Sequence, residues 1–320
     1  LVEGLFAGAR IEPMAGDAST RRFYRLRSGD TTRVIMDYGA RFTGDTDDMA
    51  LTRIFEDAAL PVSRIERACP EAGCLVLEDL GDRTLESAVE DDSGERRALY
   101  DRAVELAAAI AERGTPVLAR SERASGPALD AERFRFEMDF FVEHYVEGFL
   151  GRSEAISLLV DPLHDLADRA AQTPRSVLCH RDYHSRNLLV RPDGSIAMVD
   201  IQDARWGPDT YDLASLLRDA YVDLDENDVE TWIESYRTRL ADPPERHAFR
   251  DRFDVVAAQR MIKALGTFGY QIGSLGRTRY SVAVTRTVGR LADLLPRCEQ
   301  TALLGKVFRE TGLLEIPPAA

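Results

Sequence analysis

A polar loop between two apolar strands constrains this chain more than any other segment. The loop 180–187 reads His-Arg-Asp-Tyr-His-Ser-Arg-Asn and therefore places Asp182 five residues before Asn187. The strand that follows runs into Arg-Pro-Asp-Gly at 191–194, which is typical of a hairpin turn, and the next apolar stretch ends at Asp200. A hairpin of this kind predicts that Asp200 returns to lie beside Asn187.

These three oxygen-bearing side chains match the layout of a phosphoryl-transfer site. Transfer of the γ-phosphoryl of ATP needs one carboxylate to orient the acceptor hydroxyl, and an amide and a second carboxylate to hold Mg²⁺ against the phosphates. We therefore predict Asp182 as the catalytic residue and Asn187 and Asp200 as the metal ligands. An ordinary hairpin with a polar loop would explain 180–187 alone, but the arrival of Asp200 on a second strand favours the kinase interpretation.

Three motifs carry a resemblance that spans nearly the whole chain: 180–187, Val-Asp-Ile-Gln-Asp at 199–203, and Thr-Tyr-Asp-Leu-Ala at 210–214. They resemble the aminoglycoside-phosphotransferase-type kinases, a branch of the protein-kinase-like fold. Within that branch, the chain is most similar to the anomeric sugar kinases that phosphorylate N-acetylmuramate and N-acetylglucosamine at C1 in peptidoglycan recycling. The stretches that carry this closer similarity are 16–25, 77–81 and 202–221.

The resemblance implies an α+β, two-lobed fold. A small nucleotide-binding lobe, 1–80, would hold an antiparallel sheet and one helix, and a mainly helical lobe, 81–320, would hold the catalytic and acceptor residues. The residue pattern agrees, because it predicts strands at 23–26, 33–37 and 74–78 and a helix at 47–59. In the second lobe it predicts the catalytic hairpin as the only strands, and helices at 95–113, ending at Gly114, and at 133–150, 154–171, 209–222, 229–240, 245–272 and 281–295.

The nucleotide phosphates are assigned to a turn of small residues before the first predicted strand. Small side chains let backbone N–H groups approach phosphate oxygens, although a plain strand-joining turn has the same composition. The candidate residues in this turn are Gly16, Asp17 and Ser19.

The strand 33–37 has Met36 where the wider fold carries a phosphate-gripping lysine. Another cation must then neutralise the phosphates. Our hypothesis assigns this charge to Arg21 or Arg22, and both remain open as ordinary surface arginines.

The segment around Glu78 and Leu80 resembles the hinge that reads adenine through its backbone, and an acidic turn between domains would have the same sequence. By the same resemblance, Glu137, Asp203 and Arg205 line the acceptor pocket together with Asp182. Glu137 lies beside the apolar stripe of a predicted helix, where a solvated flank is the alternative.

Three other residues near the loop have simpler interpretations than catalysis. His184 is expected to fix the loop by hydrogen bonds, and Asp212 to act as a helix cap or loop anchor. Cys179 is expected to be a buried small residue, and the four cysteines are expected to be reduced thiols, because their spacing suits neither a disulfide framework nor a zinc site.

Composition limits the partners. The net charge is −14, from 41 basic and 55 acidic residues, and opposes binding to nucleic acid or anionic lipid. No apolar run is long enough to cross a bilayer, and residues 1–6 lack the regions of a signal peptide, so we expect a cytoplasmic enzyme with a small-molecule amino-sugar substrate. The sequence leaves its oligomeric state undetermined.

Two other functions remain open at this stage. One is another small-molecule kinase of the same fold, acting on an aminoglycoside, a choline-like amine or a hydroxylated amino acid, for which an acid-lined pocket would be expected. The other is a pseudokinase that binds nucleotide without turnover. The missing lysine supports it, while the presence of Asp182, Asn187 and Asp200 together opposes it.

Overall fold

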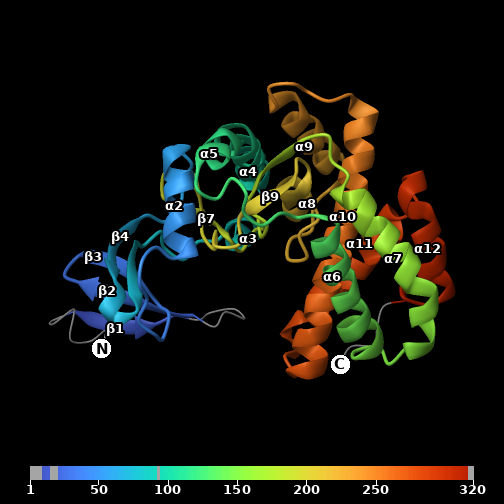
Figure 1. Ribbon diagram of the computed structural model, residues 1–320, viewed down its shortest axis with the longest axis horizontal. Coiled ribbons are helices and arrows are strands. Elements are labelled where there is room, and N and C mark those ends of the chain that lie inside the picture. Colours follow the sequence, from blue (N-terminus) through green and yellow to red (C-terminus); the bar gives the residue numbers. More distant parts are fainter. Residues whose placement is uncertain (1–8, 15–20, 92–93, 316–320) are drawn as a thin grey trace.

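The computed structural model describes the chain apart from residues 1–8, 15–20, 92–93 and 316–320 (Figure 1). It shows an α+β fold in which a sheet-containing N-terminal part lies at one end and a mainly helical part makes up the rest. The predicted fold class is thereby confirmed. Among the helices drawn in full, none combines the length and apolar character needed to cross a membrane.

The N-terminal part is a five-stranded antiparallel sheet in the order β1-β2-β3-β5-β4. Its strands are β1 (Arg10–Pro13), β2 (Arg22–Ser28), β3 (Thr31–Asp37), β4 (Ile65–Cys69) and β5 (Cys74–Glu78). The three predicted strands are confirmed as β2, β3 and β5. The sequence pattern missed the edge strands β1 and β4, whose polar, partly exposed residues suit an edge but give no buried alternation.

Helix α2 (Asp47–Asp57) joins the sheet to the larger part of the molecule (Figure 1). Thr46 caps it, because its side chain accepts a hydrogen bond from the backbone N–H of Met49. Leu51 and Phe55 of this helix pack into the large core of the helical part, whereas the sheet has its own small core around Ile35. Helix α2 therefore anchors the sheet to the catalytic part.

The rest of the chain is mainly helical. Its helices are α3 (Leu85–Asp91), α4 (Arg96–Ala109), α5 (Thr115–Arg120), α6 (Ala131–Phe141), α7 (Ile156–Ala171), α8 (Tyr211–Leu217), α9 (Glu226–Arg239), α10 (Arg246–Gly269), α11 (Ser281–Leu294) and α12 (Glu299–Glu310). Short π-helical turns, Ile110–Gly114, Val142–Glu147 and Tyr270–Ser274, continue α4, α6 and α10. The helix predicted over 209–222 is shorter than expected, since α8 ends at Leu217.

Two pairs of short strands lie within the helical part. Strands β7 (Leu188–Val190) and β8 (Ile196–Met198) form the predicted hairpin. Strands β6 (Ser176–Cys179) and β9 (Arg205–Pro208) form a second antiparallel pair. The prediction that the hairpin supplies the only strands here was therefore wrong, because β9 is too short and too polar to show a strand pattern.

The predicted helix end at Gly114 was also wrong. Gly114 has right-handed backbone angles, with φ near −73°, and the chain continues into α5. A Cβ atom at this position would lie 2.6 Å from Cδ2 of Leu178 on β6. The glycine therefore permits close packing between this helix and β6 and does not act as a terminating cap.

Helix α10 is the central element of the helical part. It packs against α6, α7, α8, α11 and α12 (Figure 1). Gly266 and Gly269 let it approach the end of α6, because Cβ atoms there would lie 2.9 Å from Cα of Phe141 and 2.7 Å from Cα of Tyr145. This packing fixes the position of the polar residues that α10 carries toward the loop 180–187, which we call the catalytic loop because it contains Asp182, the predicted catalytic residue.

Candidate active site

A cleft of about 510 Å³ lies between the sheet and the helical part. Met36 of β3 and the segment from Leu77 to Gly81 line one side. The catalytic loop and the residues after β8 line the other side, where Asp182, Asn187 and Asp200 all face the same space. The three residues singled out from the sequence therefore share one cavity.

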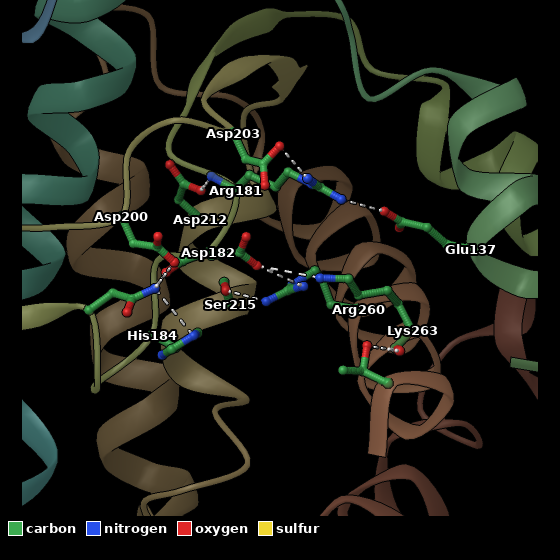
Figure 2. A network of polar contacts seen from close by, with 12 residues as sticks. Glu137, Arg181, Asp182, His184, Asp200, Asp203, Asp212, Ser215, Arg260 and Lys263 are labelled. Carbon is green, nitrogen blue, oxygen red and sulfur yellow. Dashed lines mark hydrogen bonds and ion pairs between the residues drawn. The ribbon is translucent and has the colours of Figure 1, made fainter. Parts of the chain in front are cut away.

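The hairpin places Asn187 and Asp200 side by side, as predicted. Strands β7 and β8 pair in the register Leu188 with Met198, and the backbone N–H of Val199 donates to the carbonyl of Asn187. The Nδ2 atom of Asn187 lies 2.9 Å from the backbone oxygen of Asp182 and 3.5 Å from Oδ2 of Asp200 (Figure 2). Asn187 thereby ties the loop to the second strand.

Asp212 holds the start of the loop. Its carboxylate accepts hydrogen bonds from the backbone N–H groups of His180, at 2.7 Å, and Arg181, at 3.0 Å. Arg181 has a left-handed backbone with φ of 79°, a conformation that is costly for a residue with a side chain. The prediction of Asp212 as a loop anchor is confirmed, while the cap position of α8 is occupied by Thr210.

The hairpin end is held in a similar way. Asp200 also has a left-handed backbone, with φ of 64°, and its Oδ1 accepts a hydrogen bond from Gln202 at 2.7 Å. Nε2 of His180 lies 3.0 Å from the carbonyl oxygen of Val199, next to Asp200. Both ends of the site are thus fixed by bonds to backbone atoms rather than by apolar packing alone.

Asp182 faces two cations from α10. Its Oδ1 lies 3.4 Å from Nζ of Lys263 and 3.9 Å from Nη1 of Arg260 (Figure 2). Burial alone would raise the pKa of Asp182, but Lys263, Arg260 and Arg181 outweigh this effect and hold the pKa well below its usual range. The carboxylate is therefore ionised at every pH where the protein is expected to work.

A smaller cavity of about 140 Å³ adjoins the cleft at Asp182, His184 and Tyr221. We call it the acceptor-side cavity, because it borders Asp182 on the side away from the sheet. Cationic residues at the end of α8 and in α10 reach its wall: Arg218, Arg260 and Lys263.

The residues assigned to the acceptor form a connected series of ion pairs beside the loop. Arg181 contacts Asp203 at 2.9 Å and Glu137 at 3.3 Å (Figure 2). Glu137 also accepts a hydrogen bond from Gln259 at 2.8 Å. Glu137 is only 3% exposed, so the solvated-flank alternative was wrong. Arg205 pairs with Asp203 at 2.9 Å.

These ion-paired side chains lie behind the loop. Neither the cleft nor the acceptor-side cavity, as the described residues define them, is lined by Glu137, Asp203 or Arg205. Their observed contacts support Arg181 and hence the backbone of the loop.

The nucleotide-side predictions fall into three groups. Gly16, Asp17 and Ser19 lie outside the described residues. Met36, Glu78 and Leu80 line the cleft. The remaining two residues are the arginines that follow the turn.

These arginines occupy different surroundings. Arg21 contacts Asp48 of α2 at 3.1 Å, and Asp48 lines the cleft and accepts a hydrogen bond from Tyr38 at 2.7 Å. The side chain of Arg22 is 66% exposed and contacts Asp37 at 3.0 Å. Arg21 is therefore the one beside the cleft.

His184 and Cys179 match their simpler interpretations. His184 lies with Nε2 3.4 Å from Nδ2 of Asn187, and its ring contacts Tyr221. Cys179 is buried, and burial raises the pKa of its thiol well above the usual range, which opposes a nucleophilic role. All four cysteines are free thiols.

Sequence reasoning missed Lys263 and Arg260. They come from α10, about 80 positions after Asp182, and in the sequence they are ordinary members of an amphipathic helix. Composition did hold a signal: the chain contains 41 lysines and arginines, of which only Lys263 and Lys306 are lysines. A rare lysine inside a strongly predicted helix could have been singled out.

Comparison with known proteins agrees with this geometry. The profile of the phosphotransferase enzyme family, APH, matches residues 10–250. An N-acetylmuramate/N-acetylglucosamine kinase of Pseudomonas putida is 30% identical over 306 residues, covering 92% of this chain and 86% of that protein. A protein of the same name from Neisseria meningitidis is 29% identical over 312 residues, covering 91% and 87%.

Solved structures share the fold at lower identity. Choline kinase LicA from Streptococcus pneumoniae superposes with a TM-score of 0.61 at 15% identity, covering 91% of this chain and 96% of that chain. A spectinomycin phosphotransferase, solved with ADP and spectinomycin, gives a TM-score of 0.58 at 13% identity, with 97% of each chain covered. Together with the family match over most of its length, these findings show that the chain belongs to the APH phosphotransferase family and is a small-molecule kinase.

Proposed function

We propose that this kinase transfers the γ-phosphoryl group of ATP to the anomeric C1 hydroxyl of N-acetylmuramate, N-acetylglucosamine or both. The observation that carries the proposal is the convergence of Asp182, Asn187 and Asp200 on one cleft, in a chain whose relatives at about 30% identity bear that name. Such an enzyme would serve cell-wall recycling in the cytoplasm, where ATP is available.

Asp182 would orient the acceptor hydroxyl. A carboxylate whose pKa is held low is a weak base, so its contribution is a directed hydrogen bond that aligns the attacking oxygen. The hydroxyl proton would pass to Asp182 only as the new bond to phosphorus forms. Catalysis in this site then depends on positioning more than on base strength.

The donor set at the hairpin fits Mg²⁺. Asn187 and Asp200 offer an amide oxygen and a carboxylate within one small region, and Mg²⁺ commonly takes one or two protein oxygens with phosphate and water completing its shell. When bound there, the ion would neutralise charge on the phosphates.

Met36 cannot neutralise the negative charge of the nucleotide phosphates, so we assign this role to Arg21. It lies beside Asp48, which faces the cleft, whereas Arg22 points to solvent. The Arg21→Ala variant should therefore raise the KM for ATP, and Arg22→Ala, the matched control, should leave it nearly unchanged. Equal effects of the two substitutions, or none, would remove this assignment.

The nucleotide base is assigned to the segment after β5. Glu78, Leu80 and Gly81 line the cleft at its sheet side, and Ser63 donates to the carbonyl of Glu78 while the N–H of Glu78 donates to Arg64. Because the backbone of Glu78 is used in this way, adenine would be read by the backbone from Asp79 onward.

The charge around the acceptor-side cavity disfavours a cationic substrate. Aminoglycosides and choline-like amines are recognised by carboxylates, yet Arg218, Arg260 and Lys263 line this cavity beside Asp182 and Asp219. The likeness to choline kinases is at 15% identity and concerns the fold alone. A neutral or anionic acceptor suits these walls better.

A coupled assay of ADP release with a panel of acceptors tests the proposal. N-acetylmuramate or N-acetylglucosamine should support turnover, whereas aminoglycosides, choline and hydroxylated amino acids should not. Phosphorus and proton NMR of the product would identify C1 and the anomer. The Asp182→Ala variant should abolish ADP release. If no sugar stimulates ADP release under any condition, a pseudokinase would be favoured instead. Turnover with an aminoglycoside alone would overturn the substrate assignment.

A further inference from the structure

The described residues that line the acceptor-side cavity include more cationic than anionic side chains: Arg218, Arg260 and Lys263 against Asp182 and Asp219. Two of its charged residues already have partners within the protein. Arg218 makes two contacts with Glu226, at 2.5 and 3.1 Å, and the carboxylate of Asp219 accepts hydrogen bonds from the backbone N–H groups of Ser185 and Tyr221. Neither of these groups needs a ligand.

Lys263 and Arg260 are in a different state. Arg260 donates to the hydroxyl of Ser215 at 2.6 Å, and the carboxylate that faces both cations in the described structure is Asp182, at 3.4 and 3.9 Å. The neighbouring carboxylate, Glu137, is hydrogen-bonded to Arg181 and Gln259. Glu137 also attracts both cations, but among the described residues Asp182 is the carboxylate within ion-pair distance of the two, and it must also hold the acceptor hydroxyl.

Both cations are removed from bulk water. Arg260 is 9% exposed, and the side chain of Lys263 is 20% exposed. Burial and the nearby Arg260 lower the pKa of Lys263 more than Asp182 and Glu137 raise it, which agrees with incomplete compensation of its buried charge. A second anion in the cavity would do so, since a buried charge needs a partner to be stable.

Lys263 faces the acceptor and not the nucleotide. Lys263 lines the acceptor-side cavity, and it is not among the described residues that line the large cleft. Its ammonium carries three rotatable donors, and lysine occurs at only one other position, Lys306, in a chain otherwise served by arginine. The volume of about 140 Å³ equals roughly four to five water molecules, enough for a short carboxylated substituent.

We propose that Lys263 and Arg260 form a subsite for a carboxylate of the acceptor, so that this kinase prefers the amino sugar carrying a lactyl carboxylate, N-acetylmuramate, over neutral N-acetylglucosamine. The inference rests on the proposed function and refines it. The reacting hydroxyl occupies the border at Asp182, and the lactyl group enters the cavity between the ends of α8 and α10.

The test removes charge from the ligand and from the protein independently. The wild-type enzyme is assayed with N-acetylmuramate and with its methyl ester, which has nearly the same shape but no charge. The ratio of kcat/KM for acid over ester should be about tenfold or more. In Lys263→Met the ratio should fall toward one, and Lys263→Arg should restore part of it.

The chain offers a matched control in Lys306, whose side chain is 66% exposed on α12. Lys306→Met should keep the wild-type ratio. If Lys263→Met turns over too slowly to assay, calorimetric binding of acid and ester to that variant gives the same comparison. An equal use of acid and ester by the wild-type enzyme, or an unchanged ratio in Lys263→Met, would overturn the inference while leaving the proposed function intact. A wild-type enzyme that uses neither amino sugar would overturn both.

Discussion

Substitution of Asp212 should reveal how much of the catalytic loop is held by one buried carboxylate. Asp212 is 5% exposed and accepts two backbone hydrogen bonds, from His180 and Arg181. In Asp212→Ala both N–H groups lose their partner in a site that water does not reach easily, and an unsatisfied buried donor costs about 1–3 kcal/mol. The left-handed backbone of Arg181 loses its support as well.

An opposing effect reduces the total. Burial raises the pKa of Asp212, so removal of the carboxylate also relieves the cost of burying a charge. We therefore expect Asp212→Ala to lower the free energy of unfolding by about 2–4 kcal/mol, less than the sum of two lost bonds. Asp212→Asn keeps one acceptor oxygen and should cost about 1–2 kcal/mol.

Urea denaturation measured for wild type and both variants gives these values. The control is Asp223→Ala, because Asp223 pairs with Arg286 at 2.7 Å but its side chain is 72% exposed, and the loss should stay below about 1 kcal/mol. In the ADP-release assay, Asp212→Asn should lower kcat more than it changes the KM for ATP, since the displaced group is the catalytic loop. A change below 1 kcal/mol in Asp212→Ala, or one equal to the Asp223 control, would refute this account of the loop.

Three other outcomes follow from the charges at and near the site. Lys263→Met should raise the pKa of Asp182, but Arg260 and Arg181 remain and should keep the carboxylate ionised, so the acid limb of the kcat/KM profile with N-acetylglucosamine should not move; a limb shifted to higher pH would show that Lys263 alone keeps Asp182 ionised. Asp200→Ala should raise the Mg²⁺ concentration for half-maximal rate by about tenfold or more, as measured by metal titration, whereas an unchanged value would place the metal elsewhere. Burial alone would raise the pKa of Glu226, but Arg218 and Arg297 lower it from 4.5 to about 2, so its contribution to stability is present above pH 4.5 and is lost as the pH falls toward 2. The difference in Tm between wild type and Glu226→Gln should accordingly shrink over that range, and it should be small because Glu226 is 48% exposed.

The local part of the site was predictable, because the relevant information is contiguous in the sequence. A turn at 191–194 between two apolar strands determines that Asn187 and Asp200 meet, whatever the rest of the chain does. The predicted anchoring by Asp212 was also correct.

The long-range part could not be derived from local patterns. Whether Glu137 lies in solvent or beneath Arg181 depends on how α6 packs against α10. Helical periodicity does not determine whether a residue at the edge of the apolar stripe is buried or exposed. The pairing of β9 with β6 joins segments almost 30 residues apart, and neither is long enough to show alternation. Lys263 and Arg260 reach Asp182 through the packing of α10 in the core, to which the close approach of Gly266 and Gly269 to the end of α6 contributes.

The distribution of charge links these observations to the choice of acceptor. The chain carries a net charge of −14, so its surface repels anions at long range. Lys263, Arg260 and Arg181 nevertheless surround Asp182 in the interior, where the low dielectric strengthens their effect. An enzyme that needed only a neutral sugar could hold Asp182 ionised with fewer cations, each of which adds a burial cost. Lys263 and Arg260 both lie within 4 Å of the same carboxylate oxygen, and this supports the proposal that they also hold a carboxylate of the acceptor.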